Sequence, residues 1–445
     1  MFGCACASLR WTPDRMTKSV VNTRTPYLIG IALLTTLLTW LAWNTNAPKM
    51  GHVLTNASDP LGYYQWLPWT FLHGDWSALP YVNYLPNGKG LSLFSMGVAI
   101  LQAPFFLMAL IYCKITGSEI TGFELPFVLT RLLAAAFYAS AGLALLFRVL
   151  ARSWPARTVW LACGLLLFGT NLYYYTVHDG GMSHIYSFFL FAVLVHLTVS
   201  MLEDPSGPRL MLIMLCSTVI VLIRPLNGVV LLVPLLYGPH SVIKSIRMRY
   251  QWVLRYWRWS VVGVGFSFVL LLPQLLYWKY ATGSYLVFTY GTKNEGFDWI
   301  DPHLWEILFS HQGGWLLYHP IMIGAMVVLL RGAYTKTPAF VDWRTILLVW
   351  TIVWYSYASW WNWWLGGSFG HRGFVEYYAI LALPFTAFVH SATQWSVRWR
   401  WPVLVLVAFL IFLNIRMGLL AFSPMDGPTW TWDSLFTFWK DSLFL

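Results

Sequence analysis

Long apolar segments separated by short polar ones run through almost the whole chain. Twelve of these segments approach the roughly 20 residues that a helix needs to cross a bilayer. The pattern therefore predicts an all-α polytopic membrane protein. The segments lie at about 26–45, 93–113, 125–148, 158–177, 185–202, 210–223, 226–238, 259–280, 314–331, 344–362, 374–392 and 402–421.

The distribution of Lys and Arg between these segments indicates which of them cross. If all twelve crossed, the basic clusters at 148–157 and 244–258 would lie outside, against the cytoplasmic bias of basic residues. The segment 93–113 contains Gly97, Gln102 and Pro104, so we interpret it as an interfacial or re-entrant helix on the outer face. About 11 transmembrane helices then remain, with 18 of the 28 bases and 4 of the 17 acids on the cytoplasmic side.

The segments 210–223 and 226–238 are short and flank a polar turn with Arg224, Pro225 and Gly228. Pro and Gly break a helix, so two short, tilted helices that meet at this turn fit the charge distribution. One kinked helix is the alternative, and it would reverse the topology of everything that follows.

The predicted organisation starts with a cytoplasmic N-terminal tail at 1–25 and a first helix that is retained rather than removed as a signal peptide. A transmembrane module at 26–280 includes a long first outer loop at 46–124 with juxtamembrane helices. An outer loop at 281–313 is long enough to act as a lid. Further transmembrane helices at 314–421 and an outer C-terminal tail at 422–445 complete the chain.

Composition supports a membrane protein and excludes several other classes. Of the 445 residues, 58% are hydrophobic and 10% are charged, which is too few charges for a soluble enzyme, a coiled coil or a disordered chain. The net charge of +11 reflects basic cytoplasmic loops, so we expect a lipid bilayer and no nucleic acid as partner. The five Cys residues show neither a metal-ligand spacing nor a disulfide framework.

The polar residues that remain gather in the predicted outer loops. In the first loop, SDPLGYYQWLP places Tyr63 and Tyr64 one turn after Asp59 if a helix begins there. Asp before Pro is also a common helix start, so a capping role for Asp59 is the alternative. Lys89 stands in the Gly-rich turn NGKG, which suits either a phosphate or a solvated turn.

The second outer loop, YYYTVHDGGMSHIYSFF, contains His178, Asp179 and His184. Two His and one Asp at a membrane surface suit a divalent metal cation or a proton relay. The spacing is a weak metal motif, and Asp179 before two glycines equally suits a simple turn. A metal site and a plain interfacial turn both stay open.

Several basic residues lie at positions where placing a charge costs free energy. Arg224 lies at the helix break within lipid depth, and Arg131 lies near the outer end of 125–148, which favours a functional role for both. Lys293 belongs to the acidic outer loop 281–313. The stretch SWWNWWLGGSFGHRGFVEYY brings His371 and Arg372 after a Gly-rich turn, an arrangement suited to an anion.

A carboxylate, anion-seeking cations and aromatic residues at one membrane face indicate group transfer from a lipid-borne phosphate. The motifs SDPLGYYQWLP and NGKGLSLFSMGVAILQAPFF, followed by TRLLAAAFYASAGLALLFRVLARSWPAR, resemble the GT-C superfamily of integral-membrane glycosyltransferases. The branch with protein O-mannosyltransferases and aminoarabinose transferases is the most similar, over about residues 26–280.

The resemblance implies a GT-C fold and a glycosyltransferase that uses a polyprenyl-phosphate-linked sugar donor and an extracytoplasmic acceptor. Asp59 would be the catalytic carboxylate, and Lys89 and Arg131 would approach the donor phosphate. The second acid that the family often has at the start of its fourth helix is replaced here by His184. The inner (plasma) membrane is the expected location, with the active site facing the periplasm or exterior.

We take Asp59 as the predicted catalytic base. The predicted substrate-binding residues are Tyr63, Tyr64, Lys89, Arg131, Arg224, Lys293, His371 and Arg372. A divalent metal cation is the cofactor considered, at His178, Asp179 and His184. An O-antigen ligase or polymerase type of transferase is the rival enzyme class, and a transporter or flippase of lipid-linked glycans is the non-enzymatic alternative.

Overall fold

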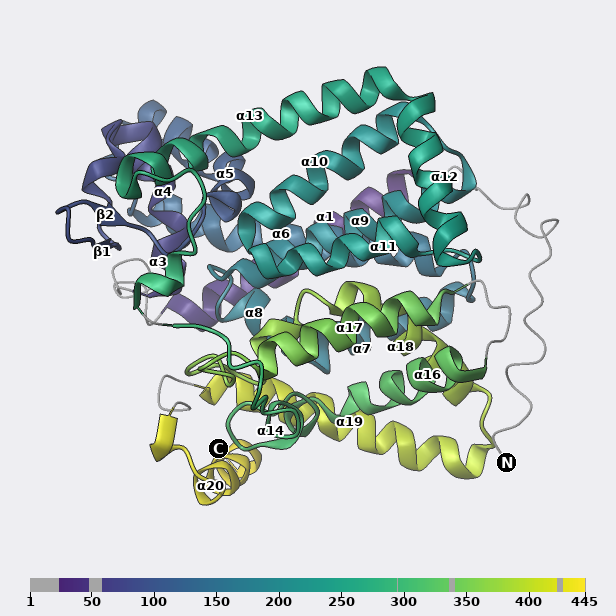
Figure 1. Ribbon diagram of the computed structural model, residues 1–445. Coiled ribbons are helices and arrows are strands. Elements are labelled where there is room, and N and C mark those ends of the chain that lie inside the picture. The colour runs from purple at the N-terminus through teal and green to yellow at the C-terminus, as the bar shows by residue number, and fades with distance from the viewer. Residues whose placement is uncertain (1–23, 48–57, 294, 336–340, 422–426, 445) are drawn as a thin grey trace.

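The computed structural model describes residues 24–47, 58–293, 295–335, 341–421 and 427–444 of the chain. It is a mostly helical protein (Figure 1), and six of its described helices are long and apolar enough to cross a membrane. These six are α1 (Arg24–Asn46, apolar from Tyr27), α5 (Gly97–Thr116), α6 (Leu125–Leu150), α9 (Ser183–Glu203), α13 (Trp257–Thr282) and α19 (Val397–Leu420). The prediction of an all-α membrane protein is confirmed at this level, and the number of crossings stays a prediction.

Shorter helices fill the remaining apolar segments. They are α7 (Ala156–Phe168), α8 (Leu172–Val177), α10 (Gly207–Ile223), α11 (Leu232–Leu236), α15 (Trp315–Tyr318), α16 (Ile323–Thr335), α17 (Trp343–Ala358) and α18 (Tyr378–Thr393). The predicted segment 158–177 is divided between α7 and α8, because Gly169 ends the first of them.

The loops contain short helices and one hairpin. The helical pieces are α3 (Asp59–Tyr64), α4 (Trp66–Pro68), α14 (Glu306–Phe309), a π-turn η3 (Trp69–His73) and the 3₁₀ turns η4 (Trp76–Ala78), η5 (Pro225–Leu231), η6 (Thr289–Lys293), η7 (Pro320–Met322), η8 (Arg372–Phe374) and η9 (Gly427–Thr429). Strands β1 (Asn83–Tyr84) and β2 (Gly90–Leu91) pair antiparallel, with Asn83 opposite Leu91. Two further helices, α12 (Val242–Arg255) and α20 (Trp432–Phe444), lie between and after the apolar ones.

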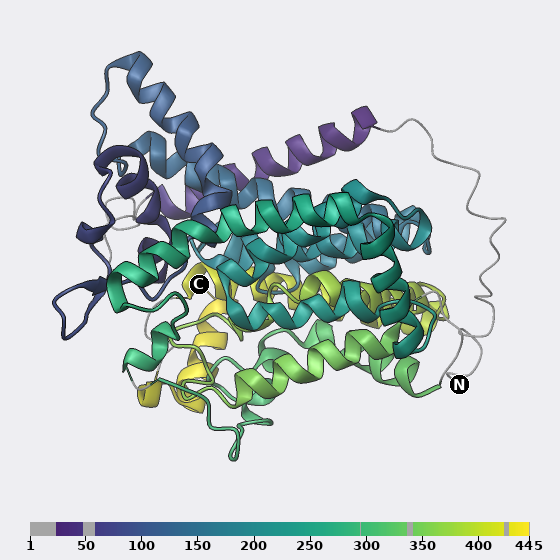
Figure 2. The same ribbon diagram turned by 45° about the horizontal axis from the view of Figure 1, so that its top comes forward.

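Most long helices run in one general direction, so the molecule has two ends (Figures 1 and 2). The first-loop elements α3, α4, β1 and β2 gather at one end, and α12 lies at the other. Helix α5 starts against α10, where Gly97 leaves no room for a side chain beside Ile223. It then projects from the bundle at an angle to α6 (Figure 2). This arrangement fits the predicted interfacial helix, although α5 is also long enough to span.

The chain reverses direction at Arg224. Helix α10 ends there, and η5 with α11 returns alongside it towards the opposite end (Figure 1). Arg224 has extended backbone, its carbonyl accepts a hydrogen bond from the Asn227 N–H, and Gly228 comes back to face Val221. Of the two readings of 210–238, the structure shows two short helical segments that meet at a polar turn.

Candidate functional site

Asp59 forms an ion pair with an arginine from the far end of the sequence. It is the first residue of α3, where Pro60 fixes the backbone angle that the first helical turn needs. Its Oδ2 lies 3.2 Å from Nη2 of Arg372, and 32% of the Asp59 side chain and 20% of the Arg372 side chain are exposed. Ser58 holds the N-cap position, so the Asp59 carboxylate takes part in a tertiary contact rather than in capping.

The loop before Arg372 has a backbone that few residues adopt. Gly366 and Gly370 have positive φ angles, and Leu365 has φ +58°, a left-handed conformation that strains a non-glycine residue. A Cβ on Gly370 would stand 2.2 Å from Nε2 of His319, which is completely buried. Glycine at 370 is therefore required both by the turn and by the packing, and this turn delivers Arg372 to Asp59.

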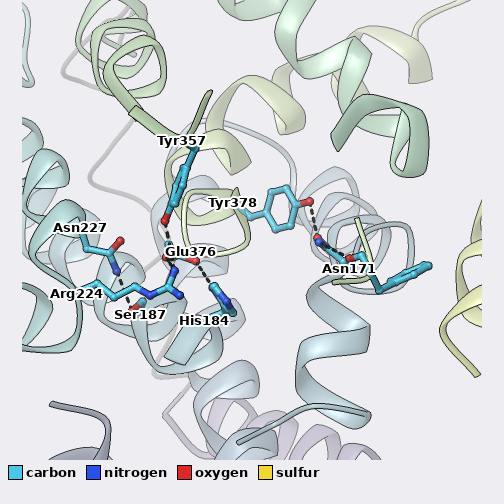
Figure 3. A network of polar contacts seen from close by, with 9 residues as sticks. Asn171, His184, Ser187, Arg224, Asn227, Tyr357, Glu376 and Tyr378 are labelled. Atoms are coloured by element: carbon cyan, nitrogen blue, oxygen red, sulfur yellow. Dashed lines mark hydrogen bonds and ion pairs between the residues drawn. The ribbon is translucent and has the colours of Figure 1, made fainter. Parts of the chain in front are cut away.

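A second ion pair, between Glu376 and Arg224, lies in the protein interior (Figure 3). One carboxylate oxygen of Glu376 lies 2.8 Å from Nδ1 of His184, and the other lies 3.9 Å from Nη1 of Arg224. Arg224 Nη1 also donates a hydrogen bond to the Tyr357 hydroxyl at 3.4 Å. Both Glu376 and His184 are completely buried. An ionised Glu376 only accepts hydrogen bonds, so the proton of the His184 ring lies on Nδ1.

Neighbouring hydrogen bonds hold this inner group in place. Asn227 Nδ2 donates to Ser187 Oγ at 3.1 Å, which joins the turn after Arg224 to α9 one helical turn beyond His184 (Figure 3). The Tyr378 hydroxyl donates to Oδ1 of Asn171 at 2.8 Å, which ties the start of α18 to α8. These two buried hydrogen bonds hold the turn after Arg224 to α9 and the start of α18 to α8.

Arg131 and Asp179 complete the charged group. Arg131 is 5% exposed and lies with its guanidinium carbon 5.8 Å from the centre of the Tyr64 ring. A Cβ on Gly181 would stand 2.7 Å from Pro60 and 3.7 Å from Arg131 Nη1, so glycine lets the second outer loop approach the first. Burial raises the pKa of Asp179 to about 6. The charges of Arg372 and Arg131 act against this rise, and Asp59 adds to it.

Three arginines and three carboxylates therefore meet at one end of the bundle, from loops and helix ends far apart in the sequence. The group consists of Arg131, Arg224, Arg372, Asp59, Asp179 and Glu376. We refer to these six residues as the charged cluster. Its positive members can hold an anion, and the carboxylate of Asp59 is partly exposed.

The predicted metal ligands do not converge. His184 points to Glu376, whereas the His178 ring stacks on Tyr174, with ring centroids 5.2 Å apart and planes 8° apart. Within the described ranges, no three His, Cys, Asp or Glu side chains are placed to hold a metal ion. The first turn of α9 directs the His184 ring to Glu376, and the metal cofactor stays a prediction.

Three other predicted binding residues are not members of the charged cluster, although the buried His371 lies within electrostatic range of Arg372 and Arg224. Lys89 donates a hydrogen bond from Nζ to the Tyr280 carbonyl at 2.9 Å and lies over the Tyr280 ring. The buried His371 ring has Nε2 2.9 Å from the Trp363 carbonyl, and burial lowers the pKa of His371 to about 3. Lys293 is the last residue of η6, and its side chain lies outside the described part of the structure.

The two predicted tyrosines are buried beside the cluster. Tyr63 packs edge-on against Phe94 at 4.7 Å between ring centroids, and it lies within electrostatic range of Arg224. Tyr64 donates a hydrogen bond to the Gly122 carbonyl at 2.5 Å and lies below Arg131. Both support the arginines, and both are only 2% exposed.

The sequence motif marked Glu376 beside His371 and Arg372 but assigned it no role, and no pattern marked Tyr357 or Asn227 as a site residue. Glu376 was visible in the motif after Arg372, and its spacing of four residues is one helical turn, which was the available signal. Tyr357 lies within an aromatic-rich helix that reads as an interfacial anchor, and no local signal distinguishes it. Their roles follow from contacts across the fold.

No family model, no curated protein and no solved structure matches the chain. The resemblance to the GT-C superfamily therefore rests on the sequence motifs alone.

Proposed function

We propose that this chain is a membrane glycosyltransferase that moves a sugar from a polyprenyl-phosphate donor to an acceptor outside the cytoplasm. The observation that carries the proposal is the Asp59–Arg372 pair, partly exposed, with Arg131 and Arg224 close behind it. A carboxylate beside several guanidinium groups at the end of an apolar helix bundle suits a reaction that releases a lipid phosphate.

Arg372 is the first candidate to bind the donor phosphate, because it is the partly exposed arginine that touches Asp59. A phosphate carries more negative charge than a carboxylate and accepts two parallel hydrogen bonds from a guanidinium. Donor binding would therefore draw Arg372 from Asp59 to the phosphate. Arg131 and Arg224 would strengthen the positive potential from behind.

The exchange of partners would leave Asp59 free to act as the base. The acceptor hydroxyl oxygen attacks the anomeric carbon, a new carbon–oxygen bond forms, and the bond from that carbon to the phosphate oxygen breaks. The polyprenyl phosphate leaves with the electron pair, and Asp59 takes the proton of the acceptor hydroxyl.

The test is mass spectrometry of lipids that co-purify with the protein, followed by transfer from the lipid that is found. We expect a polyprenyl-phosphate sugar on the native protein, less of it on Arg372→Gln, and transfer lowered about 10²- to 10⁴-fold by Asp59→Asn. Asp75→Asn is the matched control, because Asp75 lies exposed in the same outer loop and bonds only to Ser77 there. A near-native rate for Asp59→Asn would refute the base assignment.

The identity of the bound lipid and a separate transport assay distinguish the rival functions. A diphosphate-linked glycan in place of the monophosphate would favour a ligase or polymerase type of transferase. Movement of lipid-linked glycan across proteoliposomes in the absence of any acceptor would favour a flippase. Either outcome would overturn the proposed donor or the proposed reaction.

A further inference from the structure

Helix α12 lies across the end of the bundle opposite the charged cluster. It connects α11 to α13, and in both Figure 1 and Figure 2 it runs crosswise to the two helices that it joins. Its direction would place it along the membrane plane if the long helices cross the bilayer. No part of the proposed transfer reaction uses it.

One side of α12 holds it to the protein. Ser245 is completely buried, and Arg249 donates from Nε to the Pro234 carbonyl at 3.0 Å and from Nη2 to the Tyr237 carbonyl at 2.6 Å. After the end of the helix, the Tyr256 hydroxyl donates to the Pro205 carbonyl at 2.6 Å. Positions 245, 249, 252 and 256 follow helical spacing, so this inner side is fixed.

A second side of α12 is apolar and exposed. Ile243 is 75% exposed and Tyr250 is 61% exposed. The spacing of three and four residues places these side chains on one stripe, which we call the α12 apolar stripe. It consists of Ile243, Ile246, Tyr250, Val253 and Leu254, and the exposed Trp257 follows as the first residue of α13.

The stripe continues onto the candidate membrane span that follows. Val261, Val264 and Phe268 of α13 are each more than half exposed, and with Trp257 they keep the same helical spacing. A continuous apolar surface that turns from a crosswise helix onto a membrane-length helix is what a bilayer covers. A protein partner that covered α12 alone would leave the exposed apolar residues of α13 uncovered.

The third side of α12 is basic. Lys244, Arg247 and Arg255 are exposed and, at 100° per residue, lie on the side of the helix between the apolar stripe and the inner side. The sequence has no Asp or Glu between Asp204 and Glu295, so nothing nearby in the chain neutralises these bases. Such a helix lies in the interface, with its apolar side in the acyl region and its bases at the headgroups.

We propose that α12 is an interfacial helix that binds anionic phospholipid headgroups through Lys244, Arg247 and Arg255, with its apolar stripe in the bilayer. Each base close to an anionic leaflet strengthens association about fivefold. The proposal does not depend on the transferase function. It gives the end of the molecule opposite the charged cluster a lipid ligand of defined chemistry.

The test uses the full-length protein in nanodiscs with a fluorophore on a cysteine placed by Ile246→Cys. Cys4 and Cys6 are replaced by serine, and Cys113, Cys163 and Cys216 are buried. The discs contain phosphatidylcholine and a smaller fraction of phosphatidylglycerol. One set of discs contains brominated phosphatidylcholine and the other contains brominated phosphatidylglycerol, because bromine quenches a nearby fluorophore. We expect stronger quenching by brominated phosphatidylglycerol than its share of the lipid accounts for.

The variants make the result specific. The triple change Lys244→Gln, Arg247→Gln and Arg255→Gln should lower the phosphatidylglycerol preference several-fold and leave quenching by phosphatidylcholine in place. The matched control removes three exposed lysines outside α12: Lys114→Gln, Lys279→Gln and Lys440→Gln. It should keep the preference.

Equal preference in the native protein and the triple variant would overturn the headgroup assignment. Quenching by aqueous iodide and by neither lipid would overturn the interfacial position and favour a solvated or protein-covered helix.

Discussion

The two ion pairs of the charged cluster differ in their access to water. Asp59 and Arg372 form the outer pair, and both side chains keep between a fifth and a third of their surface exposed. Glu376 and Arg224 form the inner pair, in which Glu376 is completely buried and is also bonded to His184. The two pairs share neighbouring backbone, because Arg372 and Glu376 lie one helical turn apart.

The difference in exposure to water gives the two ion pairs different tasks. A buried charge that loses its partner is costly, so the inner pair stays together as long as the protein is folded. An exposed pair is worth little and exchanges partners easily, so Arg372 is free to move from Asp59 to an incoming anion. The rigid inner pair thus positions the backbone that carries the movable outer one.

The largest expected effect is at the inner pair. Glu376→Gln leaves the shape nearly unchanged but removes the charge that faces Arg224 and turns one of the two acceptor oxygens into an amide donor. We expect a loss of about 3–5 kcal/mol in the free energy of unfolding, because the guanidinium of Arg224, with only 18% of its side chain exposed, loses its charged partner. Thermal unfolding in detergent micelles measures it. Glu306→Gln is the matched control, because Glu306 is exposed and its change should have almost no effect.

A second variant tests the cause. Adding Arg224→Gln to Glu376→Gln removes both charges and should restore most of the lost stability. If the double variant is less stable than Glu376→Gln alone, the loss comes from packing or from His184 rather than from the unpaired charge.

A smaller effect is expected at Asp179, which lies near the outer pair and Arg131. The pKa of its carboxyl is about 6 in the folded protein and 3.8 as its ordinary value, so the folded state holds the proton more tightly. The free energy of unfolding therefore falls as the pH rises from about 4 to about 6, and the ionised group is a cost above that range.

Asp179→Asn removes this cost, because asparagine stays neutral. We expect the variant to be more stable than the native protein by about 2 kcal/mol above pH 6, with the advantage vanishing below about pH 4. Unfolding temperatures over this pH range measure it, with the exposed Asp433→Asn as control. An advantage that is independent of pH would point to an effect of shape instead of charge.

The sequence predicted the helices better than it predicted the contacts at the site. Apolar length and Pro–Gly breaks are local properties, so the reversal at Arg224 and the helix start at Asp59 could both be expected. The approach of Arg372 to Asp59 depends on how α3 and η8 pack from opposite ends of the chain. No local pattern encodes that contact, although both residues were selected as single candidates.

The second outer loop shows why closeness in sequence misleads. His178, Asp179 and His184 lie within seven residues, which suited a metal site. The glycine turn and the start of α9 at Ser183 direct them differently, and His184 meets Glu376 from 192 positions away. The decisive factor is the direction in which a helix presents its first turn, and this depends on the packing of α9 against the rest of the bundle.

The smallest effect on stability is expected at the outer pair. In a double-mutant cycle of Asp59→Asn and Arg372→Gln, measured by thermal unfolding, we expect a coupling of about 0.5–1 kcal/mol, because both side chains reach water. A coupling as large as that of Glu376 with Arg224 would mean that the outer pair is also structural. Arg372 would then be unable to leave Asp59 for a phosphate. A small coupling, combined with the loss of donor lipid from Arg372→Gln, is the result that an exchangeable pair requires.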